Sequence, residues 1–215
     1  MSPAENQTPQ HVSGRKRFLQ LFLVFSTAVL CAVTPLRAGD AGKDQPQVRF
    51  DEIIERIASK YTVDPLLVKA LIWRESRFLP RSKGAAGEIG LMQIKMAVVK
   101  DWAKAKGKEI PNEEEVFDPY LNIEIGTWHL SRALKNWEGN PDCYALALCE
   151  YNAGRTRLLR WIAHYDGSCL HTVKYSASAK YVRDITDKFI EYSLDHALLG
   201  MFALRDEPQL SGDEG

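Results

Sequence analysis

The stretch of residues 64–93 constrains the fold more than any other part of the sequence. Asp64 followed by Pro65 is typical of a helix start, because aspartate caps free backbone N–H groups and proline suits the first helical position. Leu71 and Ile72 then recur at helical spacing and mark one apolar face. A proline and two glycines after this helix indicate that it ends and that a loop folds back.

Glu75 lies on the apolar side of this helix, because it follows Leu71 by four residues and Ile72 by three. Burial raises the pKa of a carboxyl group, and a glutamic acid that donates a proton near neutral pH needs such a shift. Spacing by itself is also compatible with a solvated or ion-paired glutamate. Glu75 is therefore a candidate acid whose role depends on further evidence.

Helical periodicity recurs along the remaining chain and predicts a mostly α-helical fold with a minor β element. The charged segment 108–115 is expected to be a loop, and residues 81–89 cannot form a regular helix because they contain Gly84 and Gly87. The apolar residues 198–204 are expected to pack back on the core. The other expected helices lie at 51–60, 95–106, 119–137 and 141–153, and around 158–162 and 181–189.

Four blocks along the chain occur in the order of one known family. Residues 75–80 read ESRFLP, residues 90–94 read GLMQI, residues 151–154 read YNAG, and Tyr181-Val182 follows. These blocks resemble the ES-x-F-x-P … GLMQ signature, the YNAG element and the late tyrosine of the lytic transglycosylases of the lysozyme superfamily. The first two blocks are specific as a pair, whereas either alone would be weak evidence. The resemblance extends from Ile53 to Phe189.

The resemblance implies a lysozyme-like fold of the α+β class, mostly α-helical, with a minor β-hairpin or loop that lines the cleft. It also implies a lyase that cleaves the β-1,4 bond between N-acetylmuramic acid and N-acetylglucosamine in peptidoglycan and leaves 1,6-anhydro ends. Such an enzyme needs a single glutamic acid, because the C6 hydroxyl group of the sugar supplies the nucleophile. The family pattern assigns both proton transfers to Glu75.

The same resemblance indicates residues around the bond that is cleaved. Tyr151 matches a tyrosine beside the catalytic carboxyl group, which it could hydrogen-bond. A structural role is open for Ser76, and a core role is open for Met92 and Tyr181. The expected substrate-binding residues are Ser76, Gly90, Met92, Gln93, Tyr151, Asn152 and Tyr181.

The sequence departs from the family pattern at three positions. Gly84 stands where the family often has serine, Glu88 where it often has alanine, and Ala177 where it often has glutamate. Glu88 and Glu150 could each supply a second carboxylate, as in a muramidase-type glycoside hydrolase. A surface charge or a local ion pair is the preferred interpretation of both. A peptidoglycan-binding module without turnover is the third alternative.

The N-terminal residues have the pattern of an export signal. Arg15-Lys16-Arg17 precede an apolar run from Phe18 to Val33, and the segment ends with the small residue Ala38. The run is shorter than the roughly 20 residues of a membrane-spanning helix, although an uncleaved anchor stays open. This pattern predicts a periplasmic or cell-envelope protein. The expected parts are a signal peptide at 1–38, a linker at 39–50, the catalytic domain at 51–204 and a disordered tail at 205–215.

Charge and residue types argue against several other functions. The chain has 28 basic and 28 acidic residues, of which four basic and one acidic lie in residues 1–38, so the remainder has a net charge of −3. A mildly acidic body does not favour nucleic-acid binding. The histidines and cysteines show no metal-ligand spacing, so neither a metal nor another cofactor is expected. Peptidoglycan strands are the expected partner. Small transglycosylases of this kind often serve cell-envelope machines, but the sequence identifies none.

Three cysteines remain after the predicted signal, namely Cys143, Cys149 and Cys169. Cys143 and Cys149 lie on different faces of one expected helix, so they are not expected to pair with each other. A disulfide from Cys169 to either of them, and three reduced thiols, are both open.

Overall fold

The computed structural model describes residues 50–165 and 167–203, which belong to one compact unit. The predicted signal peptide at 1–38, nearly all of the linker and the tail at 205–215 lie outside these residues, so those assignments stay predictions. Phe50, placed at the end of the linker, is buried in the core immediately before the first helix. The core of the domain therefore includes Phe50.

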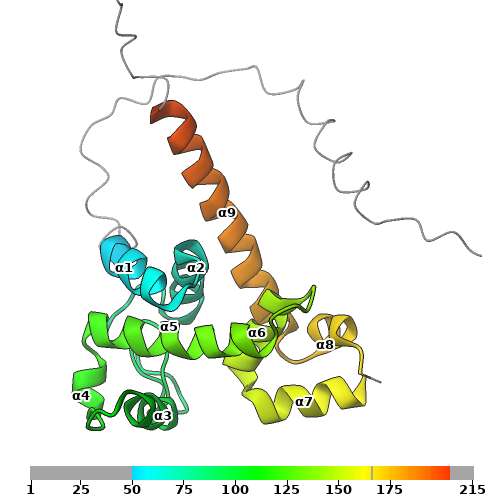
Figure 1. Cartoon of the computed structure of the whole chain (residues 1–215), viewed down its shortest axis with the longest axis horizontal. Coiled ribbons are helices and arrows are strands. Elements are labelled where there is room, and N and C mark those ends of the chain that lie inside the picture. The colour runs from blue at the N-terminus through cyan, green and yellow to red at the C-terminus, as the bar shows by residue number, and fades with distance from the viewer. Residues whose placement is uncertain (1–49, 166, 204–215) are drawn as a thin grey trace, which may run out of the picture. The chain divides into compact units, whose positions relative to one another are not determined.

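The described part of the chain is mostly α-helical, as the periodicity predicted (Figure 1). Its β structure consists of single antiparallel bridges that join Lys83 to Ile89 and Ile89 to Ile94. The expected minor β element is therefore present in the segment between the second and third helices. The helices are α1 (Asp51–Tyr61), α2 (Pro65–Ser76), α3 (Met96–Lys106), α4 (Glu113–Val116), α5 (Pro119–Asn136), α6 (Cys143–Ala153), α7 (Arg155–His164), α8 (Cys169–Tyr175) and α9 (Ala179–Ala203).

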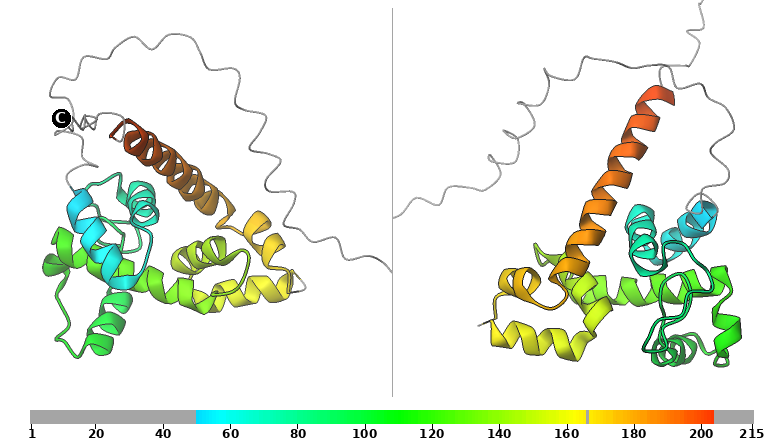
Figure 2. Two further views of the ribbon diagram at one scale, coloured as in Figure 1. Left: turned by 45° about the horizontal axis from the view of Figure 1, so that its top comes forward. Right: turned by 180° about the vertical axis from the view of Figure 1, so that it is seen from behind.

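Helix α5 is the central element of the domain (Figures 1 and 2). Helices α1 to α4 surround its N-terminal part, and α6, α7 and α8 lie at its other end. Helix α9 packs against α2 and also contacts α6, so it joins the two groups of helices. Residues more than a hundred positions apart in the sequence thus meet between α2 and α9.

Capping residues set the starts of α2 and α5, which contribute more buried residues than the other described helices. The Asp64 carboxylate accepts a hydrogen bond from the N–H of Leu66 at 2.8 Å, at the start of α2. Asp118 accepts one from the N–H of Leu121 at 2.9 Å, at the start of α5. Proline follows each aspartate at a position where the backbone N–H is not needed. Both predicted helix starts are confirmed.

The prediction of a loop throughout 108–115 was wrong at its end, where α4 forms. The side chain of Asn112 accepts a hydrogen bond from the N–H of Glu115, and the Glu115 carboxylate accepts one from the N–H of Asn112. This reciprocal pair is a capping box, and it stabilises even a short helix. The asparagine and glutamate three positions apart were the signal for it.

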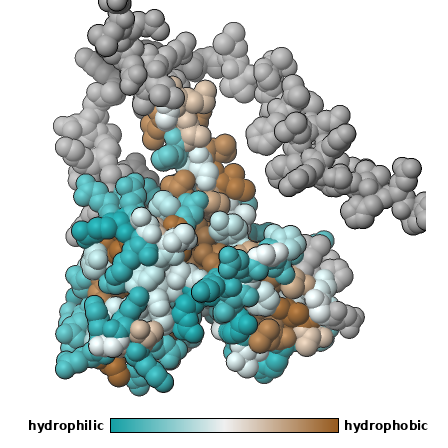
Figure 3. All heavy atoms as spheres, in the orientation of Figure 1, coloured by the Kyte–Doolittle hydropathy of each residue, from teal (hydrophilic) through white to brown (hydrophobic). Residues whose placement is uncertain are grey.

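The prediction that residues 198–204 pack back on the core was also wrong. Leu198, Leu199 and Met201 are exposed on the last turns of α9, where hydrophobic side chains reach the surface (Figure 3). Helix α9 has 25 residues and α2 has 12, so α9 extends well past the helix it packs against. Residues 179–199 contain no proline or glycine that would end α9 earlier, and the helix continues through Gly200.

The irregular segment Ile89–Gln93, here called the docked loop, is held in the core by the side chain of Asn122 on α5. The Met92 N–H donates to Asn122 Oδ1 at 2.8 Å, and Asn122 Nδ2 donates to the carbonyl oxygens of Ile89 and Val116 at 3.0 and 2.9 Å. Asn122 is fully buried, so each of its bonds replaces one to water. This one side chain fixes the docked loop to α5.

Two glycines allow this close approach. A Cβ atom on Gly90, whose φ is +74°, would lie 2.3 Å from Asn122 Nδ2. A Cβ atom on Gly126 of α5 would lie 2.4 Å from the sulfur of Met92. Larger residues at either position would push the docked loop away from α5.

The three cysteines are free thiols in the part of the chain that the structure describes. Of the two alternatives left open by the sequence, the structure has reduced thiols and no bond to Cys169.

None of the described helices is long and apolar enough to span a membrane.

Replacing Asn122 tests how strongly the docked loop depends on it. We expect Asn122→Ala to lower the free energy of unfolding by about 2–4 kcal/mol, because it leaves several buried backbone groups without partners. Urea unfolding followed by circular dichroism measures this loss. Ser131→Ala on the same helix removes a single bond to the Trp128 carbonyl and is the control, with an expected loss below about 1 kcal/mol. Equal losses in the two variants would contradict this role of Asn122.

Candidate active site

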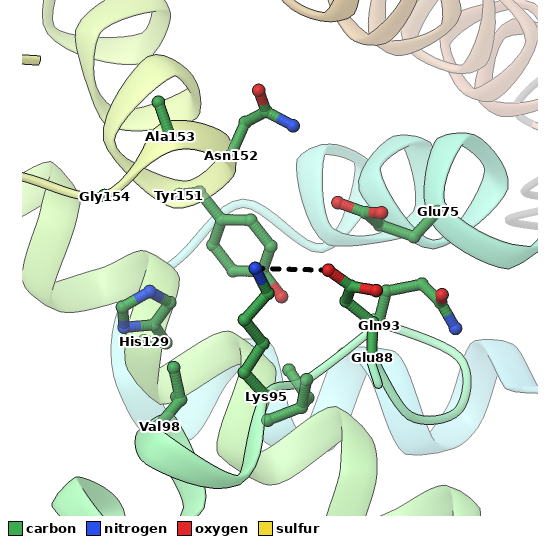
Figure 4. Close-up of a pocket in the computed structure, with 11 residues that line it drawn as sticks. Glu75, Glu88, Gln93, Lys95, Val98, His129, Tyr151, Asn152, Ala153 and Gly154 are labelled. Atoms are coloured by element: carbon green, nitrogen blue, oxygen red, sulfur yellow. Dashed lines mark ion pairs between the residues drawn. The ribbon is translucent and has the colours of Figure 1, made fainter. Parts of the chain in front are cut away.

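A cavity of about 400 Å³ opens beside the C-terminal end of α2 (Figure 4). Glu75 from α2 lines it together with Glu88 from the loop that follows, and Figure 4 shows the two carboxylates close to the Tyr151 ring. The other lining residues come from the docked loop, α3, α5 and α6. Elements from both groups of helices therefore meet at this cavity.

Glu75 is largely buried and has one direct hydrogen-bond partner in the described part of the chain. The hydroxyl group of Tyr181, on α9, donates to Glu75 Oε1 at 2.5 Å. Burial raises the pKa of Glu75 to about 7, although the Tyr181 hydrogen bond and the charge of Arg74 act in the opposite direction. The charge of Glu88 raises it further. A carboxyl group with this pKa can donate a proton and take one back near neutral pH.

Tyr181 is positioned by an ion pair between α2 and α9. Arg74 Nε lies 3.1 Å from the carboxylate of Asp184, and the Arg74 guanidinium carbon lies over the Tyr181 ring, 5.2 Å from its centroid. Tyr181 itself is buried. Burial and the nearby Glu75 charge raise the pKa of Tyr181 well above its usual value, so the phenol stays protonated and remains a donor.

Tyr151 lines the cavity but does not make the hydrogen bond that the sequence suggested. Its hydroxyl group donates to the carbonyl oxygen of Met92 at 2.9 Å, whereas Tyr181 donates to Glu75. The Tyr151 ring packs on the ring of His129, with centroids 5.2 Å apart. Tyr151 therefore ties α6 to the docked loop and forms one wall of the cavity.

Gln93 and Asn152 also line the cavity. The amide group of Gln93 donates to the carbonyl oxygens of Gly90 and Ser82 at 2.9 and 3.2 Å. Asn152 accepts a hydrogen bond from the Ser178 hydroxyl group at 2.7 Å. Each side chain is thus oriented by a neighbouring loop while one part of it faces the cavity.

Ser76, Gly90 and Met92 are buried and do not line the cavity. The Ser76 hydroxyl group donates to the carbonyl oxygen of Leu91 at 2.8 Å, which joins the end of α2 to the docked loop. The structure therefore gives these residues a supporting position next to the cavity. Their substrate contacts stay a prediction.

Glu150 does not belong to the cavity. Its carboxylate accepts hydrogen bonds at 2.8 Å from Asn136 Nδ2 and Trp137 Nε1, and it pairs with Arg155 at 3.0 Å. This network around the buried Glu150 carboxylate connects α5, α6 and α7. The preferred interpretation of Glu150 as a member of a local ion pair is confirmed, and Glu150 is not available as a second carboxylate.

Sequence reasoning missed Lys95 and His129, which both line the cavity. Lys95 follows the GLMQI block directly, and His129 lies two helical turns after Asn122, so it faces the same side of α5. Burial and the charge of Arg132 lower the pKa of His129, so its ring is neutral near pH 7. These spacings could have identified both residues.

In the part of the chain that the structure describes, no three or more histidine, cysteine, aspartate or glutamate side chains group as a metal site would require. The expectation of no metal stays a prediction from the sequence.

The raised pKa of Glu75 has a consequence for stability. A carboxyl group with a pKa of about 7 in the folded protein and 4.5 when exposed destabilises the fold as the pH rises from 4.5 through 7. We expect Glu75→Gln to raise the free energy of unfolding by about 2–3 kcal/mol at pH 8 and by less than about 1 kcal/mol at pH 5. Urea unfolding at the two pH values measures this. The exposed Glu114→Gln is the control, and the same gain at both pH values in Glu75→Gln would contradict the assignment.

Sequence comparison identifies relatives of this chain. The Transglycosylase SLT domain family matches residues 52–168. Membrane-bound lytic murein transglycosylase E of Buchnera aphidicola is 38% identical over 117 residues, which cover 52% of this chain and 52% of that protein. Membrane-bound lytic murein transglycosylase C of Yersinia enterocolitica is 27% identical over 152 residues, which cover 67% of this chain and 42% of that protein. The chain thus matches about half or less of the length of these relatives.

Solved structures confirm the expected lysozyme-like fold of the lytic transglycosylases. The 70 kDa soluble lytic transglycosylase of Escherichia coli superposes with a TM-score of 0.60 at 23% identity, over 67% of this chain and 24% of that one. An inactive mutant of the lytic transglycosylase Slt from Pseudomonas aeruginosa gives a TM-score of 0.59 at 22% identity, over 73% of this chain and 26% of that one. Together with the family match over more than half of the chain, the fold shows that this protein belongs to the Transglycosylase SLT domain family.

Proposed function

We propose that this protein is a peptidoglycan lytic transglycosylase that cleaves the β-1,4 bond between N-acetylmuramic acid and N-acetylglucosamine. The observation that carries the proposal is Glu75, a largely buried carboxyl group with a pKa raised to about 7, which lines a cavity and accepts a hydrogen bond from Tyr181. Membership of the SLT domain family and the names of the related proteins support the same activity.

In the first step, protonated Glu75 donates its proton to the glycosidic oxygen while the bond from that oxygen to C1 of N-acetylmuramic acid breaks. The N-acetylglucosamine end leaves as a neutral alcohol. Glu75 becomes a carboxylate, which the Tyr181 hydroxyl group stabilises. Positive charge develops at C1 of the remaining sugar.

In the second step, the C6 hydroxyl oxygen of the same sugar bonds to C1, and its proton passes to the Glu75 carboxylate. A 1,6-anhydro ring forms, and Glu75 returns to its starting state without the addition of water. Both proton transfers need a group whose pKa lies near the working pH, and burial gives Glu75 that property.

A muramidase-type glycoside hydrolase is the second candidate, because one observation favours it. Glu88 lines the same cavity as Glu75, so two carboxyl groups are available there. A hydrolase would add water at C1 and leave a free reducing end. The binding-module alternative has less support, because a module without turnover does not need a buried carboxyl group with this pKa.

We propose that the protein acts in the periplasm or elsewhere in the cell envelope, on peptidoglycan strands. The N-terminal pattern of basic, apolar and small residues supports export. The term membrane-bound stands in the names of the relatives. Residues 1–38 could be cleaved or kept as an anchor, and N-terminal sequencing of the exported protein would distinguish the two.

Mass spectrometry of products released from purified sacculi tests the reaction. We expect 1,6-anhydro products from the unchanged protein and at least about a 100-fold lower rate from Glu75→Gln, because that variant cannot transfer a proton. Glu114→Gln, an exposed carboxylate outside the cavity, is the control and should keep full activity. Products with a free reducing end would replace the transglycosylase proposal with the hydrolase.

The pH dependence tests the contact between Tyr181 and Glu75. Activity should fall as the pH rises through about 7, where Glu75 loses its proton. Tyr181→Phe removes a hydrogen bond that lowers the pKa of Glu75, so the alkaline limb of kcat/KM should move to higher pH. Tyr61→Phe removes a hydrogen bond to Glu124, away from the cavity, and should leave the limb in place. An unchanged alkaline limb of kcat/KM in Tyr181→Phe would refute the assignment of this limb to Glu75 and its hydrogen bond with Tyr181.

A further inference from the structure

Glu88 is the second carboxylate in the cavity, and the proposed reaction does not yet use it. It follows the bend after α2 and lines the same cavity as Glu75, and its charge raises the pKa of Glu75 (Figure 4). Its side chain is mostly buried, with an exposed fraction of 22%. A sugar that fills this cavity beside Glu75 would therefore also face Glu88.

Gly84 makes the space that Glu88 occupies. A Cβ atom on Gly84 would lie 2.3 Å from Glu88 Oε2 and 2.7 Å from the side-chain oxygen of Gln93. The Gly84 N–H also donates to the Glu88 carbonyl oxygen at 2.8 Å, which closes the loop. The two departures from the family pattern, glycine for serine and glutamate for alanine, therefore lie against each other in the folded loop.

Both oxygens of the Glu88 carboxylate have partners that hold it in its charged form. The Ala86 N–H donates to Oε2 at 3.0 Å, and Lys95 Nζ lies 3.2 Å from Oε1. Lys95 is more than half exposed, so water screens its charge while it orients Glu88. These two contacts orient the carboxylate in the structure.

The environments of the two carboxyl groups push their pKa values apart. Burial opposes the ionisation of Glu88, but backbone N–H groups and Lys95 outweigh it and lower its pKa, whereas burial raises the pKa of Glu75 to about 7. One protonated and one ionised carboxyl group in a single site is the arrangement expected of an acid and a charge stabiliser. The other titratable or charged groups that face the pair are Arg74, Lys95, His129, Tyr151 and Tyr181.

We propose that Glu88 is a second catalytic residue, which remains a carboxylate and stabilises the positive charge that develops at C1 of the sugar while Glu75 protonates the leaving oxygen. The inference rests on the proposed function of Glu75. Glu88 forms no bond to the sugar and transfers no proton in this role. The C6 hydroxyl oxygen still closes the ring, and its proton still returns to Glu75. The contribution of Glu88 is electrostatic, so it depends on charge more than on shape.

Two substitutions separate charge from shape. Glu88→Gln keeps the size and removes the charge, and we expect it to lower kcat for anhydro products by about 10- to 100-fold with little change in KM. Its alkaline limb should move to lower pH, because the charge of Glu88 raises the pKa of Glu75. Glu88→Asp keeps the charge and should retain kcat within about tenfold, with the limb in place. Glu113→Gln, which removes a lysine-paired carboxylate outside the cavity, is the control.

The outcomes are distinct. A kcat and an alkaline limb in Glu88→Gln that match the unchanged protein would overturn the inference. Equal losses in the Gln and Asp variants, with no movement of the limb, would assign Glu88 a purely structural role and would also overturn it. If the unchanged protein releases no anhydro products, the proposed function fails first, and the Glu88 variants are then compared on whatever product the unchanged protein releases.

Discussion

The backbone of the docked loop is buried without regular secondary structure, and the site depends on how its polar groups are satisfied. Buried N–H and C=O groups that lose water need other partners. Here the partners are side chains from three helices, namely Ser76 on α2, Asn122 on α5 and Tyr151 on α6. Hydrogen bonds to the loop therefore also fix these helices relative to one another. The cavity lies where they meet, so its shape follows from the hydrogen bonding of one short segment.

The packing that stabilises the domain also shifts the pKa of Glu75 away from its usual value. The packing of α9 on α2 buries its carboxyl group and raises its pKa, which costs stability at high pH. The same packing brings Tyr181 within hydrogen-bond distance of Glu75, and this hydrogen bond partly offsets the rise in its pKa. These opposing effects leave the pKa of Glu75 at about 7. Within the proposed function, that balance lets one residue act as both acid and base, while Glu88 supplies a charge that does not titrate over the same range.

Much of the fold could be predicted because its signals are local. The aspartate–proline pairs before α2 and α5 are read within a few residues, and the capping box of α4 could have been read in the same way. The exposure of the end of α9 could not be predicted, because the apolar pattern of residues 198–204 does not show whether another element packs on them. The pairing of Tyr181 with Glu75, where Tyr151 was expected, also escaped prediction, since both tyrosines lie near the carboxyl group and only the packing of α9 selects between them.

The sequence by itself determined most of the helices, the family and the candidate acid, because periodicity, capping and the ordered blocks are encoded over short distances. Only the tertiary structure decided which groups surround that acid. Glu75 and Tyr181 are separated by 106 positions, and Gly84, Glu88 and Lys95 acquire a joint role only once the loop is folded. A pKa depends on burial and on the charges within a few ångströms, and those quantities do not exist until the helices pack.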